Sequence, residues 1–274
     1  MTGFATHFFP PVWIGEQHHA NGTTKAAATN EITVAAKPLG AGHKGRKVIV
    51  GRYGFIGIET GDERDAVDAL NRIMCVALLA GLDVRTVRRS ELEEVEITDE
   101  TFEISGLGDD VVTFDLDEGN QRVSEDQMRA ILRGGEVLID HPNLTNAIQH
   151  LLEAHTQFAE GENKQSYMLA WDALEIWLSR DWCTLLSNKK VPKETYDKIT
   201  DERSWTPETI WEGLYLEAVL SEEDRGRLHA ARAVRTDVVK RAYSPTDDQA
   251  RELLDLAADF CSRSMRKWGF QLRG

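Results

Sequence analysis

The chain has 274 residues, which is enough for one large domain or two domains of ordinary size. Hydrophobic residues make up 41% of the sequence, which excludes wholesale disorder, and the apolar stretches are too short to span a bilayer. The three cysteines are far apart and form no C-x-x-C pair, so we expect neither a disulfide framework nor a metal site. The N-terminus lacks the basic segment of a signal peptide. We therefore expect a cytoplasmic protein that makes no membrane contact and uses no cofactor.

The net charge of −14 is unevenly distributed along the chain. Residues 1–140 carry 14 basic and 24 acidic side chains, and the stretch 90–121 has twelve acids and no base. By contrast, residues 225–241 hold six bases and a single acid, Asp237. Nucleic acid would be repelled by the first stretch and attracted by the second. A run of like charges can also be an ordinary solvent-exposed face. The pattern therefore permits a local basic cleft but argues against nucleic-acid binding by the whole chain.

The first 140 residues have the pattern of an α+β domain. Short β-branched or aromatic runs, separated by turn residues, predict strands at 32–34, 48–50, 55–58, 102–104 and 111–114. Glycines at 106–109 predict a hairpin turn between the last two of these strands. The strands are too close in sequence for helical crossovers, so we expect an antiparallel sheet.

Two helices are expected in the same domain. The first is capped by Asp62 and runs to about Leu79, and the second runs from Ser124 to Leu132 and stops at Gly134-Gly135. A glycine pattern at 40–45 matches G-x-G-x-x-G, but a strand follows it where dinucleotide binding requires a helix. We interpret these glycines as a loop.

Residues 141–274 keep a helical period throughout and predict an all-α bundle, so that the chain as a whole is mostly α. Apolar stripes at 144–159 and 167–185 indicate two long helices, and a third, short helix begins near Pro192. The expected starts of the last three helices are Thr206-Pro207, Ser221 and Ser244-Pro245. The tryptophans at helical spacing are interpreted mostly as core, and no pair of histidines has the spacing of a zinc site.

Residues 228–240, LHAARAVRTDVVK, carry the most specific pattern in the chain. Arg232 and Arg235 are three residues apart, on one face of the expected helix. This stretch resembles the signature helix of HEPN domains, R-N/D/H-x-x-x-H, with Thr236 at the polar position and Lys240 in the place of the histidine. Residues 154–178 also resemble the opening helical hairpin of that family, particularly of its Apea-like branch. The resemblance covers residues 144–265.

The resemblance implies a homodimer in which motif residues of two subunits face each other and cleave RNA without metal. On this basis Arg235 and Lys240 are the candidate catalytic residues. The candidate RNA-binding residues are Arg232, Arg235, Lys240 and Arg241, with Glu175 and Thr236 in supporting roles. Glu175 is expected to pair with Arg232 or Arg235. An ordinary lysine has a pKa of about 10.4, so a lysine in place of the histidine argues against ribonuclease activity.

Three hypotheses follow from these residues. The first is a HEPN-like protein that binds RNA or a partner through a basic dimer cleft without cleaving RNA, in prokaryotic defence or a toxin–antitoxin system. The second is an active metal-independent endoribonuclease that uses Arg235 and Lys240. The third is a dimerisation or sensor module in which residues 1–140 recognise a protein or ligand. In the third case the arginines and Glu175 form only a structural ion-pair cluster.

Overall fold

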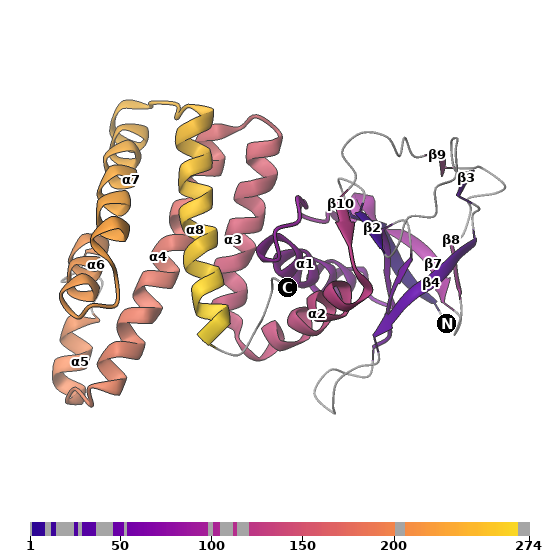
Figure 1. Cartoon of the computed structure of the whole chain (residues 1–274), viewed down its shortest axis with the longest axis horizontal. Coiled ribbons are helices and arrows are strands. Elements are labelled where there is room, and N and C mark those ends of the chain that lie inside the picture. Colours follow the sequence, from indigo (N-terminus) through magenta and orange to yellow (C-terminus); the bar gives the residue numbers. More distant parts are fainter. Residues whose placement is uncertain are drawn as a thin grey trace. The chain divides into compact units, whose positions relative to one another are not determined.

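In the computed structural model, the chain is mostly helical after an antiparallel β-sheet near the N-terminus (Figure 1). It divides into two compact units, Met1–Thr145 with Met265–Gly274, and Asn146–Ser264. We call these the barrel unit and the helical unit. The residues described below are 2–8, 12–14, 25–26, 29–36, 46–51, 54–97, 101–104, 112–113, 121–200 and 206–267. The glycines at 40–45 and the turn at 106–109 lie outside these ranges.

Six strands of the barrel unit close into an antiparallel barrel in the order β1-β6-β5-β4-β8-β7, and β7 pairs with β1. Their bounds in that order are Thr2–His7, Phe55–Ile58, Val48–Gly51, Thr29–Ala36, Thr101–Ile104 and Glu93–Ile97. Two further pairs are parallel β2–β10, Val12–Ile14 with Gln121–Val123, and antiparallel β3–β9, Lys25–Ala26 with Val112–Thr113. The expected antiparallel sheet is confirmed.

The expected hairpin between the last two predicted strands is wrong. Strand β8 pairs with β4 on one edge and with β7 on the other, and β9 pairs with β3. Because both edges of β8 are already hydrogen-bonded, the segment that follows it cannot join it as a hairpin partner.

Helix α1, Glu63–Leu79, is capped as expected, because the Asp62 side chain accepts a hydrogen bond from the backbone N–H of Arg64 at 2.8 Å. Helix α2, Glu125–Val137, begins at the Ser124 cap but runs through Gly134-Gly135 instead of stopping there. A Cβ atom on Gly134 would lie 2.6 Å from Cγ1 of Val76. These glycines therefore permit close packing of α1 and α2 and do not end a helix. Two 3₁₀ turns, η1 (Arg89–Glu91) and η2 (Leu138–Asp140), complete the unit.

Six helices occupy the described part of residues 141–267, close to their predicted positions. They are α3 Pro142–Ala159, α4 Asn163–Asn188, α5 Lys193–Ile199, α6 Pro207–Leu216, α7 Glu222–Arg241 and α8 Asp247–Lys267. The predicted stripe of α4 lies in the core, where Tyr167, Trp171, Leu174 and Leu178 are each at most 2% exposed. No helix among the described residues combines the length and hydropathy needed to cross a bilayer.

The helix starts are set by local side-chain caps. Thr206 and Ser221 cap α6 and α7 as expected. The cap of α8 is Thr246, not Ser244-Pro245: its Oγ1 accepts from the backbone N–H of Gln249 at 3.3 Å, and Gln249 Oε1 accepts from the N–H of Thr246 at 3.0 Å. The predicted start was therefore too early by about two residues, which is a common size of error for helix ends.

The packing of Gly134 leads to a stability prediction. Gly134→Ala places a methyl group against Val76, and we expect the free energy of unfolding to fall by about 1–3 kcal/mol. The control is Gly226→Ala in α7, where nothing lies within 4 Å of an added Cβ, and this change should stabilise by about 0.5–1 kcal/mol. Urea unfolding of the full chain measures both. An unchanged midpoint for Gly134→Ala would contradict the packing argument.

Candidate functional site

Helix α7 carries most of the predicted site residues, and its orientation in the bundle is set by a few buried ones. Leu228, Ala231 and Val238 are buried on one face, together with Asp224 near the start of the helix. Asp224 accepts two hydrogen bonds from Arg263 of α8, at 2.8 and 2.9 Å, and one from the backbone N–H of Ser221 at 3.1 Å. This ion pair joins α7 to α8.

The electrostatics of Asp224 follow from its burial and its partners. Burial alone would raise its pKa, but the hydrogen bonds from Arg263 and Ser221 favour the ionised form and lower the pKa from 3.8 to about 2. The same partnership raises the pKa of Arg263. The pair is therefore ionised at neutral pH and contributes to stability there.

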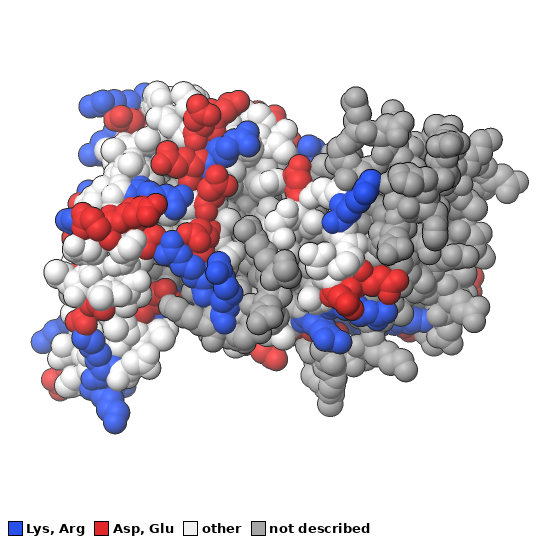
Figure 2. Space-filling view, in the orientation of Figure 1, with Lys and Arg blue, Asp and Glu red and all other residues white. Residues whose placement is uncertain are grey.

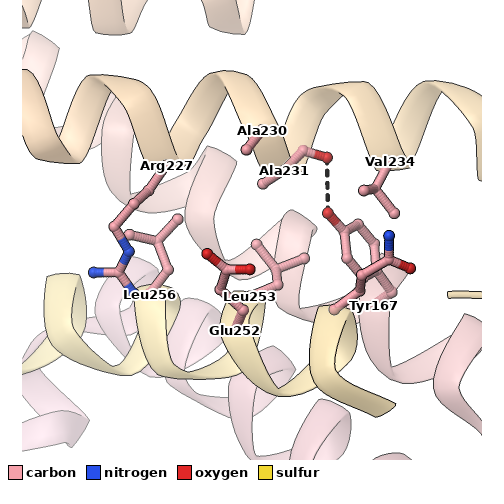
Figure 3. Close-up of a pocket in the computed structure, with 9 residues that line it drawn as sticks. Tyr167, Arg227, Ala230, Ala231, Val234, Glu252, Leu253 and Leu256 are labelled. Carbon is pink, nitrogen blue, oxygen red and sulfur yellow. Dashed lines mark hydrogen bonds between the residues drawn. The ribbon is translucent and has the colours of Figure 1, made fainter. Parts of the chain in front are cut away.

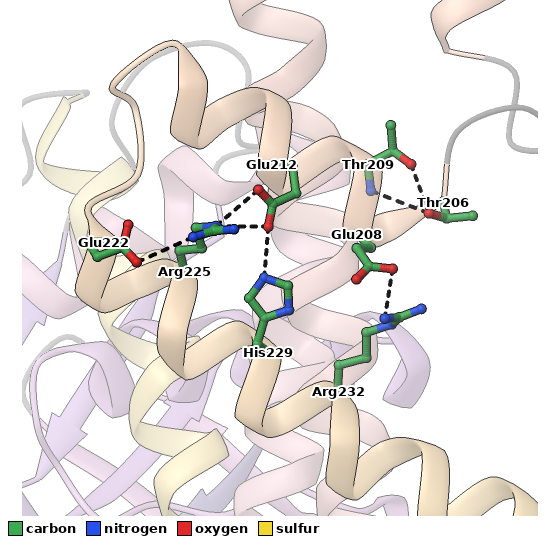
Figure 4. A network of polar contacts seen from close by, with 8 residues as sticks. All are labelled: Thr206, Glu208, Thr209, Glu212, Glu222, Arg225, His229 and Arg232. Carbon is green, nitrogen blue, oxygen red and sulfur yellow. Dashed lines mark hydrogen bonds and ion pairs between the residues drawn. The ribbon is translucent and has the colours of Figure 1, made fainter.

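Acidic residues of α6 neutralise the first half of α7 (Figure 4). Arg225 donates from Nε to both carboxylate oxygens of Glu212, at 2.9 and 3.0 Å, and His229 Nε2 lies 2.8 Å from the same carboxylate. These hydrogen bonds, with that from Arg225 the largest influence, lower the pKa of Glu212. One turn further along, Arg232 pairs with Glu208 at 2.7 Å. The two helices are therefore joined by a row of ion pairs.

Arg235 points toward α4 instead. Its guanidinium lies 5.3 Å from the ring centroid of Trp171, and its Nη2 atom is 3.8 Å from Oε1 of Glu175. Trp171 donates its indole N–H to the same carboxylate of Glu175. The expected pairing of Glu175 is therefore found with Arg235, whereas Arg232 has a different partner. Arg235 and Glu175 are only half-buried, with side chains 35% and 28% exposed.

The C-terminal half of α7 is more open. Lys240 is exposed and has no ion-pair partner among the described residues, whereas Arg241 pairs with Asp237 at 3.1 Å. Thr236 donates its hydroxyl to the carbonyl oxygen of Arg232 at 2.9 Å, so its hydrogen is engaged by its own helix. Arg235 and Lys240, five residues apart, are separated by about 140° around the helix. Within one chain they do not converge on a common point.

The structure also shows partners that the sequence analysis missed, namely Glu208, Glu212 and His229. The first two are four residues apart on α6, and Arg225, His229 and Arg232 recur at matching intervals on α7. Residues three or four apart lie on one helical face, so two complementary charged faces could have been recognised from this spacing. On the face shown in Figure 2, basic and acidic side chains alternate over the helical unit.

The aromatic interpretation is confirmed for the described tryptophans of this unit. Trp171, Trp177, Trp182 and Trp211 are at most 7% exposed, and Trp171 packs edge-on against Trp211 at 6.1 Å. Trp205 lies outside the described residues. Within the described ranges, no group of three or more His, Cys, Asp or Glu side chains is placed to hold a metal ion.

Comparison with known proteins gives no family assignment: no family model matches the sequence, and neither the curated proteins nor the solved structures contain a significant match.

The Asp224–Arg263 pair predicts a specific dependence of stability on pH. Because the pKa of Asp224 is lower in the folded protein than in the unfolded chain, its ionised form stabilises the fold at pH values above about 4. This contribution, about 2 kcal/mol, disappears as the pH falls from about 4 to about 2. Urea unfolding at a series of pH values should show that Asp224→Asn is less stable at pH 7 and has a flatter profile in that window.

The matched control for this experiment is Asp255→Asn. Asp255 is an exposed carboxylate of α8 with no ion-pair partner among the described residues. Its removal should leave the pH profile of stability unchanged. Identical profiles for wild type and Asp224→Asn between pH 4 and 2 would contradict the assignment.

Proposed function

We propose that this protein is a HEPN-like binding protein that lacks ribonuclease activity and associates with a second copy of itself through the C-terminal half of α7. The observation that carries the first part is the position of Arg235 over Trp171 and beside Glu175. An arginine that stabilises a scissile phosphate must offer its guanidinium to the substrate. Here the guanidinium is engaged with an aromatic ring and a carboxylate of its own chain.

The choice of a protein partner over RNA rests on the charge balance of α7. Four of its six basic residues between 225 and 241 already have acidic partners, namely Arg225, Arg232, Arg235 and Arg241. Binding to a phosphate backbone gains free energy by releasing counterions from it, and bases that are already paired contribute less to this release. The helical unit therefore offers RNA much less positive charge than residues 225–241 suggest.

The proposed association surface consists of Val239, Lys240 and Tyr243. Val239 is 59% exposed and Tyr243 is 38% exposed, so that two apolar side chains flank the unpaired Lys240 at the end of α7. Exposed apolar side chains that gather on one surface favour a protein–protein contact, and the proposal takes Val239 and Tyr243 to form such a surface. A two-fold contact here agrees with the dimer that the family resemblance implies. Prokaryotic defence or a toxin–antitoxin system is the biological setting proposed from the same resemblance.

Self-association is tested by light scattering. At micromolar concentration we expect twice the chain mass of 30.8 kDa for the wild type, and a shift toward the monomer mass for Val239→Glu, because a charge buried in an apolar contact is costly. The control is Leu216→Glu at the end of α6, where an even more exposed apolar residue, 81%, lies outside the surface. A monomeric wild type would contradict the proposal.

The absence of nuclease activity is tested with unstructured RNA in the presence of a chelator. We expect no cleavage by the wild type at pH 7, because the guanidinium of Arg235 is engaged with Trp171 and Glu175 and is not offered to a scissile phosphate. Lys240→His should not by itself produce cleavage, because Arg235 remains engaged with Trp171 and Glu175. Robust cleavage by the wild type that is lost in Lys240→Ala would instead support an active endoribonuclease that uses Arg235 and Lys240.

A further inference from the structure

A pocket of about 190 Å³ lies between α7 and α8 of the helical unit, with Tyr167 of α4 in its lining. Its apolar lining consists of small and medium side chains, namely Ala230, Ala231, Val234, Leu253 and Leu256. The polar residues of the lining are Arg227, Glu252, Gln249 and Tyr167. Val239, Lys240 and Tyr243, the proposed association surface, do not line it.

The walls of the pocket carry one positive and one negative charge. Figure 3 shows Arg227 projecting from α7 and Glu252 from α8 into the region between the two helices. Among the described residues neither side chain has an ion-pair partner, in contrast to Arg225, Arg232 and Arg235 of the same helix. The pocket is therefore lined by one cation and one anion, neither of which forms an ion pair among the described residues.

Tyr167 supplies a neutral polar group. Its hydroxyl donates to the carbonyl oxygen of Ala231 at 2.7 Å, and burial, assisted by the charge of Glu252, raises its pKa (Figure 3). The phenol therefore stays protonated, and its ring fixes one part of the lining without adding charge. Gln249 is oriented in turn, because its Oε1 accepts from the N–H of Thr246 and the hydroxyl of Tyr243, both at 3.0 Å.

These features restrict the ligand by charge. A simple anion would be attracted by Arg227 but repelled by Glu252. A simple cation would be attracted by Glu252 but repelled by Arg227. A molecule with one carboxylate and one ammonium group could pair with both Arg227 and Glu252. The planar guanidinium of an arginine is the side-chain group best suited to bind a carboxylate. An α-amino acid carries both groups on one carbon, and its aliphatic side chain would fit against the alanine, valine and leucine side chains of the lining.

The size restricts the ligand further. The pocket has a volume of about 190 Å³. That space suits a small amino acid and is too small for a nucleotide or a folded peptide segment, since pockets for larger ligands typically have about 300–1,000 Å³. We propose that the pocket between α7 and α8 binds a free aliphatic amino acid, with its carboxylate on Arg227 and its ammonium group on Glu252.

The experiment is isothermal titration calorimetry of the full chain with L-alanine, L-valine and L-leucine. Isovalerate and isobutylamine, each with only one of valine's two charged groups, are the matched ligands. We expect saturable binding of at least one of the amino acids, and affinities at least tenfold weaker for the two single-charge analogues. No binding of any of the three amino acids at about 10 mM overturns the proposal.

Variants assign the binding to this pocket. Arg227→Gln and Glu252→Gln should each weaken amino-acid binding at least tenfold, because each leaves one ligand charge unpaired. The control is Arg251→Gln, which removes a charge from α8 at a residue that stacks on Phe158 and does not line the pocket. Affinity that is unchanged in Arg227→Gln overturns the proposal.

A second type of variant distinguishes loss of the binding site from loss of folding. Ala230 is exposed at the mouth of the pocket, so Ala230→Leu should fill the space without disturbing the core, and its unfolding midpoint should match that of the wild type. We expect it to lose amino-acid binding, and retention of wild-type affinity would overturn the proposal. Because the readout is a ligand titration, its outcome is independent of whether the protein dimerises or cleaves RNA.

Discussion

Arg235 of α7 lies over the indole ring of Trp171, with the carboxylate of Glu175 beside both groups, and this contact joins α7 to α4. The same kind of pairing recurs along α7, toward α6 through Arg225 and Arg232 and toward α8 through Asp224. The charges of α7 are therefore used to position it among its neighbours. A charge paired in this way is partly neutralised by its partner, so it attracts a substrate phosphate less strongly than a free charge would.

This pairing changes what the basic stretch means for function. Residues 225–241 contain six bases against one acid, yet four of the bases have an acidic partner, and all but one of those partners come from other helices or from the start of α7. The electrostatic potential of a segment depends on the charges around it in space, and sequence proximity describes only a part of these. A nucleic-acid interface is therefore a weaker interpretation of α7 than its composition suggests.

Two parts of the α7 surface remain free of this constraint, and they differ in character. At and just beyond the C-terminal end of α7, Val239 and Tyr243 are exposed apolar residues close in sequence to Lys240, which has no ion-pair partner among the described residues. On the α8 side, Arg227 and Glu252 face a small pocket whose lining is otherwise aliphatic. The first has the chemistry of a protein contact and the second that of a small-molecule site. One helix can carry both functions because its other sides are occupied by α4 and α6.

Local sequence determined the elements of this protein. The Asp62 and Ser221 caps, the apolar stripes of α3, α4 and α8, and strands β5 and β6 depend on residues within a few positions of one another, and each was predictable. Strands β1 and β7 of the barrel were not predicted. Tertiary structure decided everything that depends on distant residues. Helix α2 continues through Gly134, where Val76 of α1 packs closely against it. Strand β8 does not pair with β9, because β4 and β7 already pair with its two edges. Arg235 lies against Trp171 and Glu175 of α4. Helix caps and hydrophobic periodicity depend on residues within one or two turns of each other, so they can be recognised in the sequence. Packing, strand pairing and ion pairing join residues that are far apart in the sequence, and their sequence separation does not reveal that they are close in space.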